Sequence, residues 1–217
     1  MLPIFTSIPS IIAAITKVAA TIGPAIAKYA PMLLDVAAKY LPQVIKTVET
    51  VATVLNIISP NDSAENLGAK AMSADKKPED FDEINQYINY LKNDVKVDSS
   101  TLSKDAVDVA ARQTIGASIL IKGANEFLGI ELDLPFIKTV SQLDIDANVI
   151  VEVVKAYSDS GLNLDDYVKY VTKTLHVDEL DTHGEVLVDA YRKADPSLSE
   201  EQAEDAVMDL SLPKNSA

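Results

Sequence analysis

Residues 6–60 read TSIPSIIAAIT, KVAATIGPAIA, KYAPMLLDVAA, KYLPQVIKTVE and TVATVLNIISP when they are divided into blocks of eleven. Similar residue types recur at the same place in successive blocks. Eleven residues make three helical turns of about 3.67 residues, so this period keeps one apolar stripe on one face of a helix. The stripe consists of Ile11, Ile15, Ile22, Ile26, Leu33, Val44, Val48 and Leu55.

The opposite side of the same helical wheel is basic, with Lys17, Lys28 and Lys39 in one phase of the repeat. Prolines also recur in this stretch. A proline inside a helix costs about 3 kcal/mol, whereas the first helical turn accepts it without loss of a hydrogen bond. We therefore expect three successive helices near 9–22, 24–40 and 42–58, with the apolar stripe more buried than the lysine face.

The composition favours an all-α protein. Apolar residues make up 47% of the 217 residues, but aromatic residues only 6%, and Trp is absent. Ten Pro and seven Gly are few for this length, and the apolar residues recur mostly at intervals of three and four. We predict a multi-helix bundle that carries a proline-punctuated, amphipathic N-terminal helical arm.

Four segments follow from the distribution of residue types. We assign an amphipathic arm to 1–60, a linker to 61–78, an acidic helical body to 79–212 and a polar tail to 213–217. The segment 61–78, NDSAENLGAKAMSADKKP, has the small and polar residues of a linker and accommodates one short helix at 64–73.

A helix over 103–128 is expected at the centre of the body. Its middle, from Ile115 to Ile121, is apolar on all sides apart from Ser118, which is typical of a buried helix. Further helices are expected near 79–93, 146–158, 163–175, 183–194 and 199–210, whereas 131–142 fits either a short strand or a short helix. The expected caps are Ser103, Asp146, Asn163 and Ser199 at N-termini and Gly129 at a C-terminus.

Charge is unevenly distributed along the chain, whose net charge is −14. Residues 1–58 carry four Lys against two acidic residues, a net charge of +2, and the remainder carries −16. An acidic body repels phosphate, which excludes a role in nucleic-acid binding.

No stretch of the sequence indicates catalysis, so we expect a protein without enzymatic activity, cofactor or metal. A calcium-like segment begins at Asp144, but Val149 and Lys155 occupy the places of its Gly and its final Glu. His176 and His183 are seven residues apart in a polar stretch that is typical of a solvated loop rather than a zinc site. The absence of Cys excludes disulfides and thiolate chemistry.

A membrane-spanning helix is not expected, because charged residues interrupt every apolar run before about 18 residues. The N-terminus MLPIFTSIPS has no basic residue before its apolar residues, which is atypical of a secretory signal. We leave the location open between export without a signal peptide and association with a virion.

Three interpretations of the repeat remain open. Its stripe can pack on the body as ordinary core, lie on a membrane, or bundle with other copies. Eleven-residue units with prolines and with Lys on the polar edge resemble the lipid-surface helices of exchangeable apolipoproteins in period and composition. We therefore expect a membrane-active or envelope-interacting protein, such as a toxin, effector or virion component, that uses residues 6–58. The alternative is an assembly subunit whose N-terminal helices mediate homo-oligomerisation or docking to a partner protein.

Overall fold

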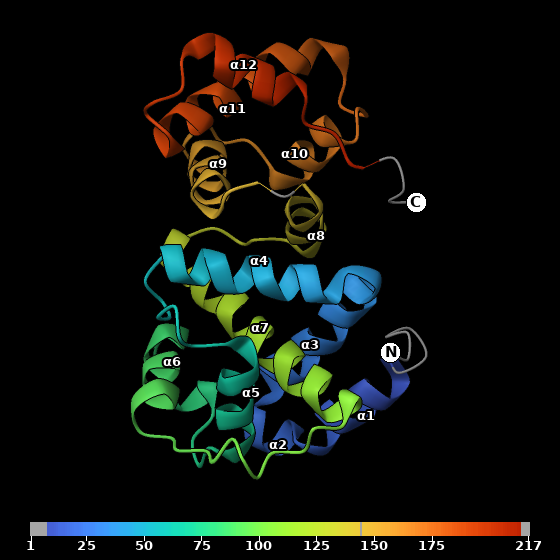
Figure 1. Cartoon of the computed structure of the whole chain (residues 1–217), viewed down its shortest axis with the longest axis vertical. Coiled ribbons are helices and arrows are strands. Elements are labelled where there is room, and N and C mark those ends of the chain that lie inside the picture. Colours follow the sequence, from blue (N-terminus) through green and yellow to red (C-terminus); the bar gives the residue numbers. More distant parts are fainter. Residues whose placement is uncertain (1–7, 144, 214–217) are drawn as a thin grey trace. The chain divides into compact units, whose positions relative to one another are not determined.

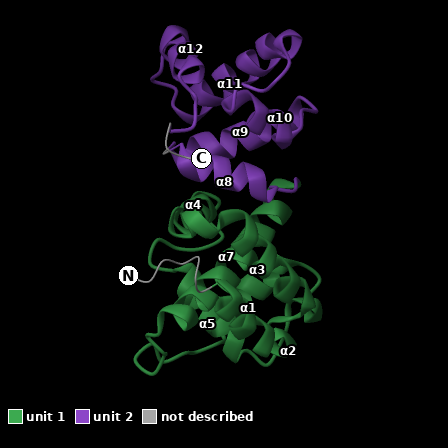
Figure 2. Cartoon of the chain, turned by 90° about the vertical axis from the view of Figure 1, so that its right-hand side faces the viewer, with its two compact units in different colours: residues 1–129 green, residues 130–217 purple. Residues whose placement is uncertain are grey.

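The computed structural model describes residues 8–143 and 145–213. All regular elements of these residues are helices, which confirms the predicted all-α class (Figure 1). The chain forms two compact units, unit 1 at Met1–Gly129 and unit 2 at Ile130–Ala217 (Figure 2). This boundary differs from the expected division into an arm, a linker and a body, because residues 8–60 share a core with the residues up to 129.

The N-terminal repeat forms a series of short helices, as its prolines predict. These are α1 (Ile8–Lys17), α2 (Ala19–Ile22), α3 (Pro24–Ala37), the 3₁₀ turn η2 (Ala38–Tyr40) and α4 (Leu41–Val54). Pro24 opens α3 and Pro42 lies in the first turn of α4, where neither costs a hydrogen bond. The first expected helix is divided in two, because the amide of Val18 donates to Ile15 in a tight turn.

The apolar stripe of the repeat is buried and its lysines are exposed, as the eleven-residue period predicts. Ile22 and Val44 have no exposed surface, and every other stripe residue is exposed by 6% or less. Lys17, Lys28 and Lys39 are all exposed. The stripe contributes to the core of unit 1, since α1, α3 and α4 all pack against α7.

The central helix of unit 1 is α7 (Ala106–Leu128), which contacts α1, α3, α4, α5 and α6. Its residues from Thr114 to Ile121 are all buried, as the uninterrupted apolar run predicts. Gly129 caps its C-terminus with φ +67°, also as predicted. The prediction that Ser103 is the N-cap of this helix is wrong. Asp105 takes this position and accepts from the amide of Val107, so the helix begins later than expected.

The segment expected to be a linker contains α5 (Ala64–Ser73), which makes the most extensive helix contact of unit 1, against α7. The helix matches the short one expected at 64–73, but Ala64, Leu67 and Gly68 are buried. At the crossing, a Cβ on Gly68 would overlap the backbone of Arg112. The small residues that look like a linker are therefore those that let two backbones approach closely.

Residues 78–93 form two elements rather than the single helix expected. Pro78 opens the 3₁₀ turn η3 (Pro78–Asp80), whose last carboxylate accepts from the amide of Lys77 at 2.8 Å. The helix α6 (Ile84–Asn93) begins separately, because Glu126 of α7 accepts hydrogen bonds from the first amides of α6, including that of Ile84 at 2.7 Å. A residue distant in sequence thus determines where α6 begins.

Unit 2 consists of α8 (Leu134–Gln142), α9 (Ala147–Asp159), α10 (Leu164–Val171), the 3₁₀ turn η4 (Val177–Glu179), α11 (Leu180–Ala194) and α12 (Glu200–Met208). The ambiguous segment 131–142 is thus helical. Three predicted N-caps are confirmed, because the side chains of Asp146, Asn163 and Ser199 accept from amides in the first turns of α9, α10 and α12. The predicted tail lies largely outside the described residues.

The core of unit 2 contains a tyrosine–histidine pair. The Oη of Tyr157 and the Nδ1 of His183 lie 2.9 Å apart and are buried. A solvated loop was predicted for His183, and this is wrong, because α11 begins at Leu180 and turns the imidazole inward. His176 is exposed, as predicted.

Candidate binding face of unit 1

The sequence-predicted site residues separate into a buried set and an exposed set. The whole apolar stripe from Ile11 to Leu55 is enclosed in unit 1, and the lysines lie outside it. The stripe is therefore core and offers no surface to a ligand. A binding face on the N-terminal helices must therefore be built from the residues between the stripe and the lysines.

The outward side of α1 and α2 provides such a face, which we call the outer face. In the first 27 residues Lys17 is the one charged side chain. Soluble surfaces normally carry charge at about a quarter to a third of their positions. The incompletely buried apolar residues of the outer face are Ile12, Ala13, Ala14, Val18, Ala19 and Ala20.

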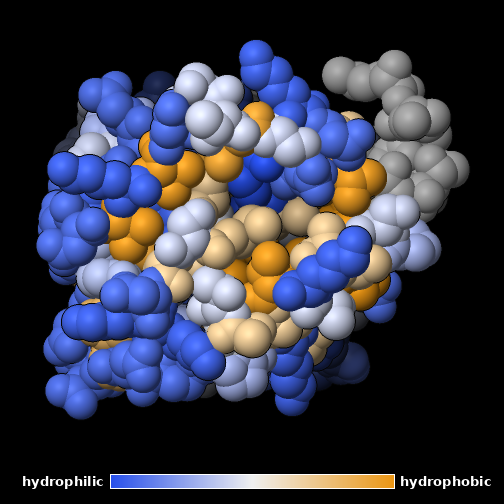
Figure 3. Space-filling model, turned by 90° about the horizontal axis from the view of Figure 1, so that it is seen from below, coloured by the Kyte–Doolittle hydropathy of each residue, from blue (hydrophilic) through white to orange (hydrophobic). Residues whose placement is uncertain are grey.

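Figure 3 views the end of unit 1 where α1 and α2 lie. Apolar side chains gather in the middle of this view and hydrophilic ones surround them. The pattern is an apolar patch with a polar rim, the arrangement found at protein and membrane interaction sites.

A hydroxyl beside the outer face, that of Thr16, is turned toward the backbone of α1. The Thr16 hydroxyl donates to the carbonyl of Ile12 at 2.8 Å. This bond satisfies the polar atom within the helix and lowers the cost of removing it from water.

The electrostatic setting of the outer face differs from that of the rest of the chain. Unit 1 contains 12 basic and 14 acidic residues, a net charge of −2, whereas unit 2 contains 7 basic and 19 acidic residues, a net charge of −12. Within unit 1 the first acidic residue is Asp35. The outer face therefore has a cation, Lys17, and its one acid in contact among the described residues is Glu79, which accepts from the amide of Ala25 at 3.3 Å beside the end of α2.

The titratable groups with shifted pKa values are structural. Burial raises the pKa of the Tyr157, Tyr167 and Tyr191 hydroxyls, and Tyr191 reaches about 12. Burial likewise raises the pKa of Asp133, which accepts from the amide of Phe136 at 2.6 Å and caps α8. These shifts follow from core positions or helix capping.

Metal-binding clusters of three or more His, Asp or Glu are absent from residues 8–143 and 145–213. Asp144, the first residue of the calcium-like segment, lies outside the described residues, and Asp146 caps α9 instead. The described helices include none that is long and apolar enough to cross a membrane.

Comparison with known proteins returns no match to a family model, to a curated protein or to a solved structure.

The sequence contains a signal for the outer face that the repeat obscures. Ile11 and Ile12 are adjacent, and the stripe explains only the first. Ile12 and other apolar residues lie outside the stripe, and residues 1–27 include only one charged side chain. This combination indicates a helix that is apolar on its second side as well.

Proposed function

We propose that this protein is non-enzymatic and binds the surface of anionic membranes through the outer face of α1 and α2, as a toxin, effector or virion component would. The observation that carries the proposal is the apolar outer face with Lys17 as its charged residue. A face of this kind loses little on leaving water, because it has almost no charge to desolvate.

Two energetic contributions support binding to an anionic bilayer. Apolar area contributes about 25 cal/mol per Å² removed from water, and a Lys near an anionic surface about 1 kcal/mol. The outer face has mainly Ala, whose area is small, so we expect weak and reversible binding in which the anionic headgroups matter.

The buried stripe supports the proposal in a second way. Protein core and lipid both exclude water, so an aliphatic side chain that moves between them keeps most of its hydrophobic stabilisation. Gly23, with φ +80°, and the tight turn at Val18 separate the first helices of the arm. A bilayer bound at the outer face would offer the stripe of α1 and α2 a second apolar environment.

The alternative function is assembly through the same face. Ala13, Ala14, Ala19 and Ala20 leave the surface smooth, which favours close packing of one helix on another. Two copies related by a twofold axis could bury this face against itself.

Flotation with vesicles separates the two functions when it is combined with light scattering. We expect the full chain to be monomeric and to float with vesicles that contain phosphatidylglycerol, and much less with pure phosphatidylcholine vesicles. A stable oligomer that stays in the aqueous fraction with both vesicles would refute membrane binding and support assembly.

A further inference from the structure

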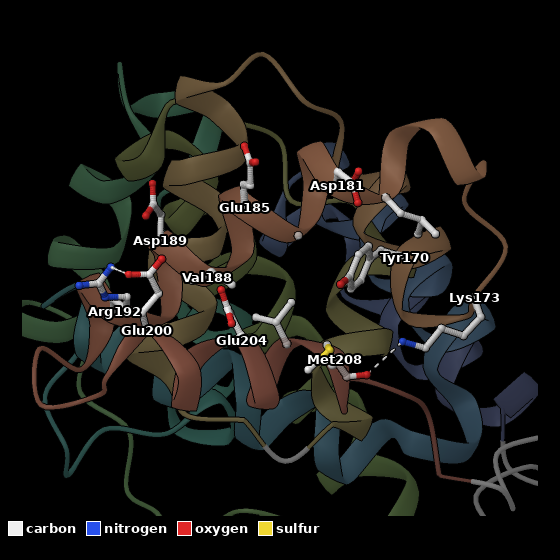
Figure 4. A pocket seen from close by; sticks show the side chains of 13 residues that line it. Tyr170, Lys173, Asp181, Glu185, Val188, Asp189, Arg192, Glu200, Glu204 and Met208 are labelled. Atoms are coloured by element: carbon white, nitrogen blue, oxygen red, sulfur yellow. Dashed lines mark hydrogen bonds and ion pairs between the residues drawn. The ribbon is translucent and has the colours of Figure 1, made fainter.

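Unit 2 contains a groove of about 800 Å³ between α11 and α12, which Tyr170 of α10 also lines (Figure 4). The turn that joins the two helices is set by Asp195, whose carboxylate accepts from the amide of Ser197 at 3.0 Å and from its hydroxyl at 2.6 Å. The Ser199–Gln202 capping box then starts α12, which packs against α11.

Apolar residues of both helices line the groove. They include Val188 of α11, which is half-buried, and Val207 and Met208 of α12, of which Val207 is buried. We call the accessible pair, Val188 and Met208, the apolar floor. Met208 is 64% exposed, although it is a large apolar side chain. An exposed apolar side chain in a groove that polar residues border is the arrangement found at interaction sites.

The rim of the groove is acidic. It includes five carboxylates, from Asp181, Glu185, Asp189, Glu200 and Glu204. Arg192 approaches Glu200 at 3.6 Å, and Lys173 is directed to the carbonyl of Met208 at 3.5 Å. Among the described residues, the three acids of α11 therefore have no basic partner at ion-pair distance.

These acids are regularly spaced along one side of α11. Asp181, Glu185 and Asp189 are each four residues apart, so a carboxylate occurs about every 6 Å along the helix axis. The lining positions of α11 extend from Leu180 to Arg192, about 18 Å, and the three acids span about 12 Å of it. A facing helix with its own cations at every fourth residue matches the spacing of these acids.

Gly184 lowers the surface of α11 in the middle of this row. A Cβ at this position would meet only the Tyr170 hydroxyl, at 3.8 Å, so the depression is open space rather than a packed crossing. A facing helix can place an apolar side chain into this depression.

We propose that this groove binds a helical segment of a partner protein that has an apolar ridge flanked by Lys or Arg at four-residue intervals. The apolar ridge would cover Val188 and Met208, and the cations would lie against the unpaired acids of α11. This site is in unit 2 and is independent of membrane binding by unit 1. The apolar floor provides most of the affinity, and the acidic rim provides orientation and speed of association.

The probe is a synthetic peptide of about 18 residues with a Leu ridge flanked by Lys at every fourth position, long enough to cover the ~18 Å of α11 that lines the groove. Fluorescence anisotropy with the full chain should give saturable binding that weakens as salt increases. Glu185→Gln with Asp189→Asn should weaken binding about tenfold. Glu201→Gln with Asp205→Asn, a matched change on α12 outside the groove lining, should alter it less than twofold.

Gly184→Leu fills the groove and should weaken binding more than tenfold. Because the added side chain enters open space, thermal unfolding followed by circular dichroism should show a folded variant. The proposal is refuted if Gly184→Leu binds normally, if the two charge-neutralised variants weaken binding equally, or if a peptide with Glu in place of Lys binds as tightly. Displacement of the peptide by spermine at equal charge concentration would also refute it, since the acids would then serve a small polycation.

Discussion

Gly116 of α7 lies against Ala64 of α5 so closely that a Cβ on the glycine would overlap the Ala64 carbonyl oxygen. Conversely, Gly68 of α5 lies so close to α7 that a Cβ on it would overlap the backbone of Arg112. These two positions fix the crossing of α5 and α7, and they explain why a segment of small residues is part of the core.

Gly116→Ala should therefore destabilise unit 1 by about 3 kcal/mol, because neither backbone can yield without moving a helix. Gly184→Ala is the matched control, since its Cβ meets nothing nearer than 3.8 Å, and it should be neutral or stabilising by up to about 1 kcal/mol. Denaturant unfolding of both variants measures the difference. Equal stabilities would contradict the observed crossing.

Glu65→Gln should lower the free energy of unfolding by about 1–2 kcal/mol, because it removes the negative charge that pairs with the buried guanidinium of Arg112. The Arg112 guanidinium, only 4% exposed as a residue, donates from Nη2 to Glu65 Oε1 at 2.8 Å and to the Ser103 carbonyl at 2.7 Å. Glu65 is about a third exposed, so solvent screens part of the effect. The control is Glu152→Gln, which removes an exposed pair with Lys155 and should cost less than about 0.5 kcal/mol. Indistinguishable losses in denaturant unfolding would contradict a structural role for the buried pair.

Alkaline pH should destabilise unit 2 through Tyr191. Burial raises the pKa of this hydroxyl to about 12, so the unfolded chain ionises at lower pH than the folded one. The stabilising contribution is complete below about pH 10 and is lost as the pH rises to about 12. Between pH 7 and pH 11, Tyr191→Phe should reduce this alkaline loss by about 1.4 kcal/mol.

The Tyr191 hydroxyl also has no hydrogen-bond partner among the described residues, so the Phe variant should be at least as stable as the parent at pH 7. Unfolding free energies at pH 7 and pH 11 test both statements. An unchanged pH dependence in Tyr191→Phe would show that other groups cause the alkaline loss.

Ile22→Asp should unfold much of unit 1, at a cost of about 5 kcal/mol or more, because Ile22 is fully buried and an unpaired carboxylate cannot be accommodated there. Far-ultraviolet circular dichroism should show a large loss of helix. A folded Ile22→Asp variant would contradict the burial of the stripe. Stripe variants therefore report on the core, and membrane binding must be tested on the outer face.

The helices and the buried stripe could be predicted because local signals determine them. The eleven-residue period of the stripe, the Ser199–Gln202 capping box and the left-handed cap at Gly129 all act within a few residues. The exposed lysine face follows from the same period.

Other features depend on contacts between distant residues. The start of α6 depends on Glu126, which accepts from the amides of Ile84 and Asn85, 42 and 41 residues before it in the chain. The composition of 61–78 does not distinguish a linker from a close helix crossing, because both favour Gly and Ala. The groove could not be predicted, since it exists only where the turn at Asp195 places α12 beside α11.

Vesicle flotation of two charge-matched variants tests whether the outer face of α1 and α2 binds anionic membranes. Ala13→Glu with Ala20→Glu places two carboxylates on the outer face, and Gln43→Glu with Asn89→Glu places two on exposed positions of α4 and α6. All four positions are exposed, so both variants should keep the fold, which circular dichroism checks. The first variant should lose flotation with phosphatidylglycerol vesicles, and the second should float almost like the parent. Equal flotation of the two variants would contradict membrane binding by the outer face.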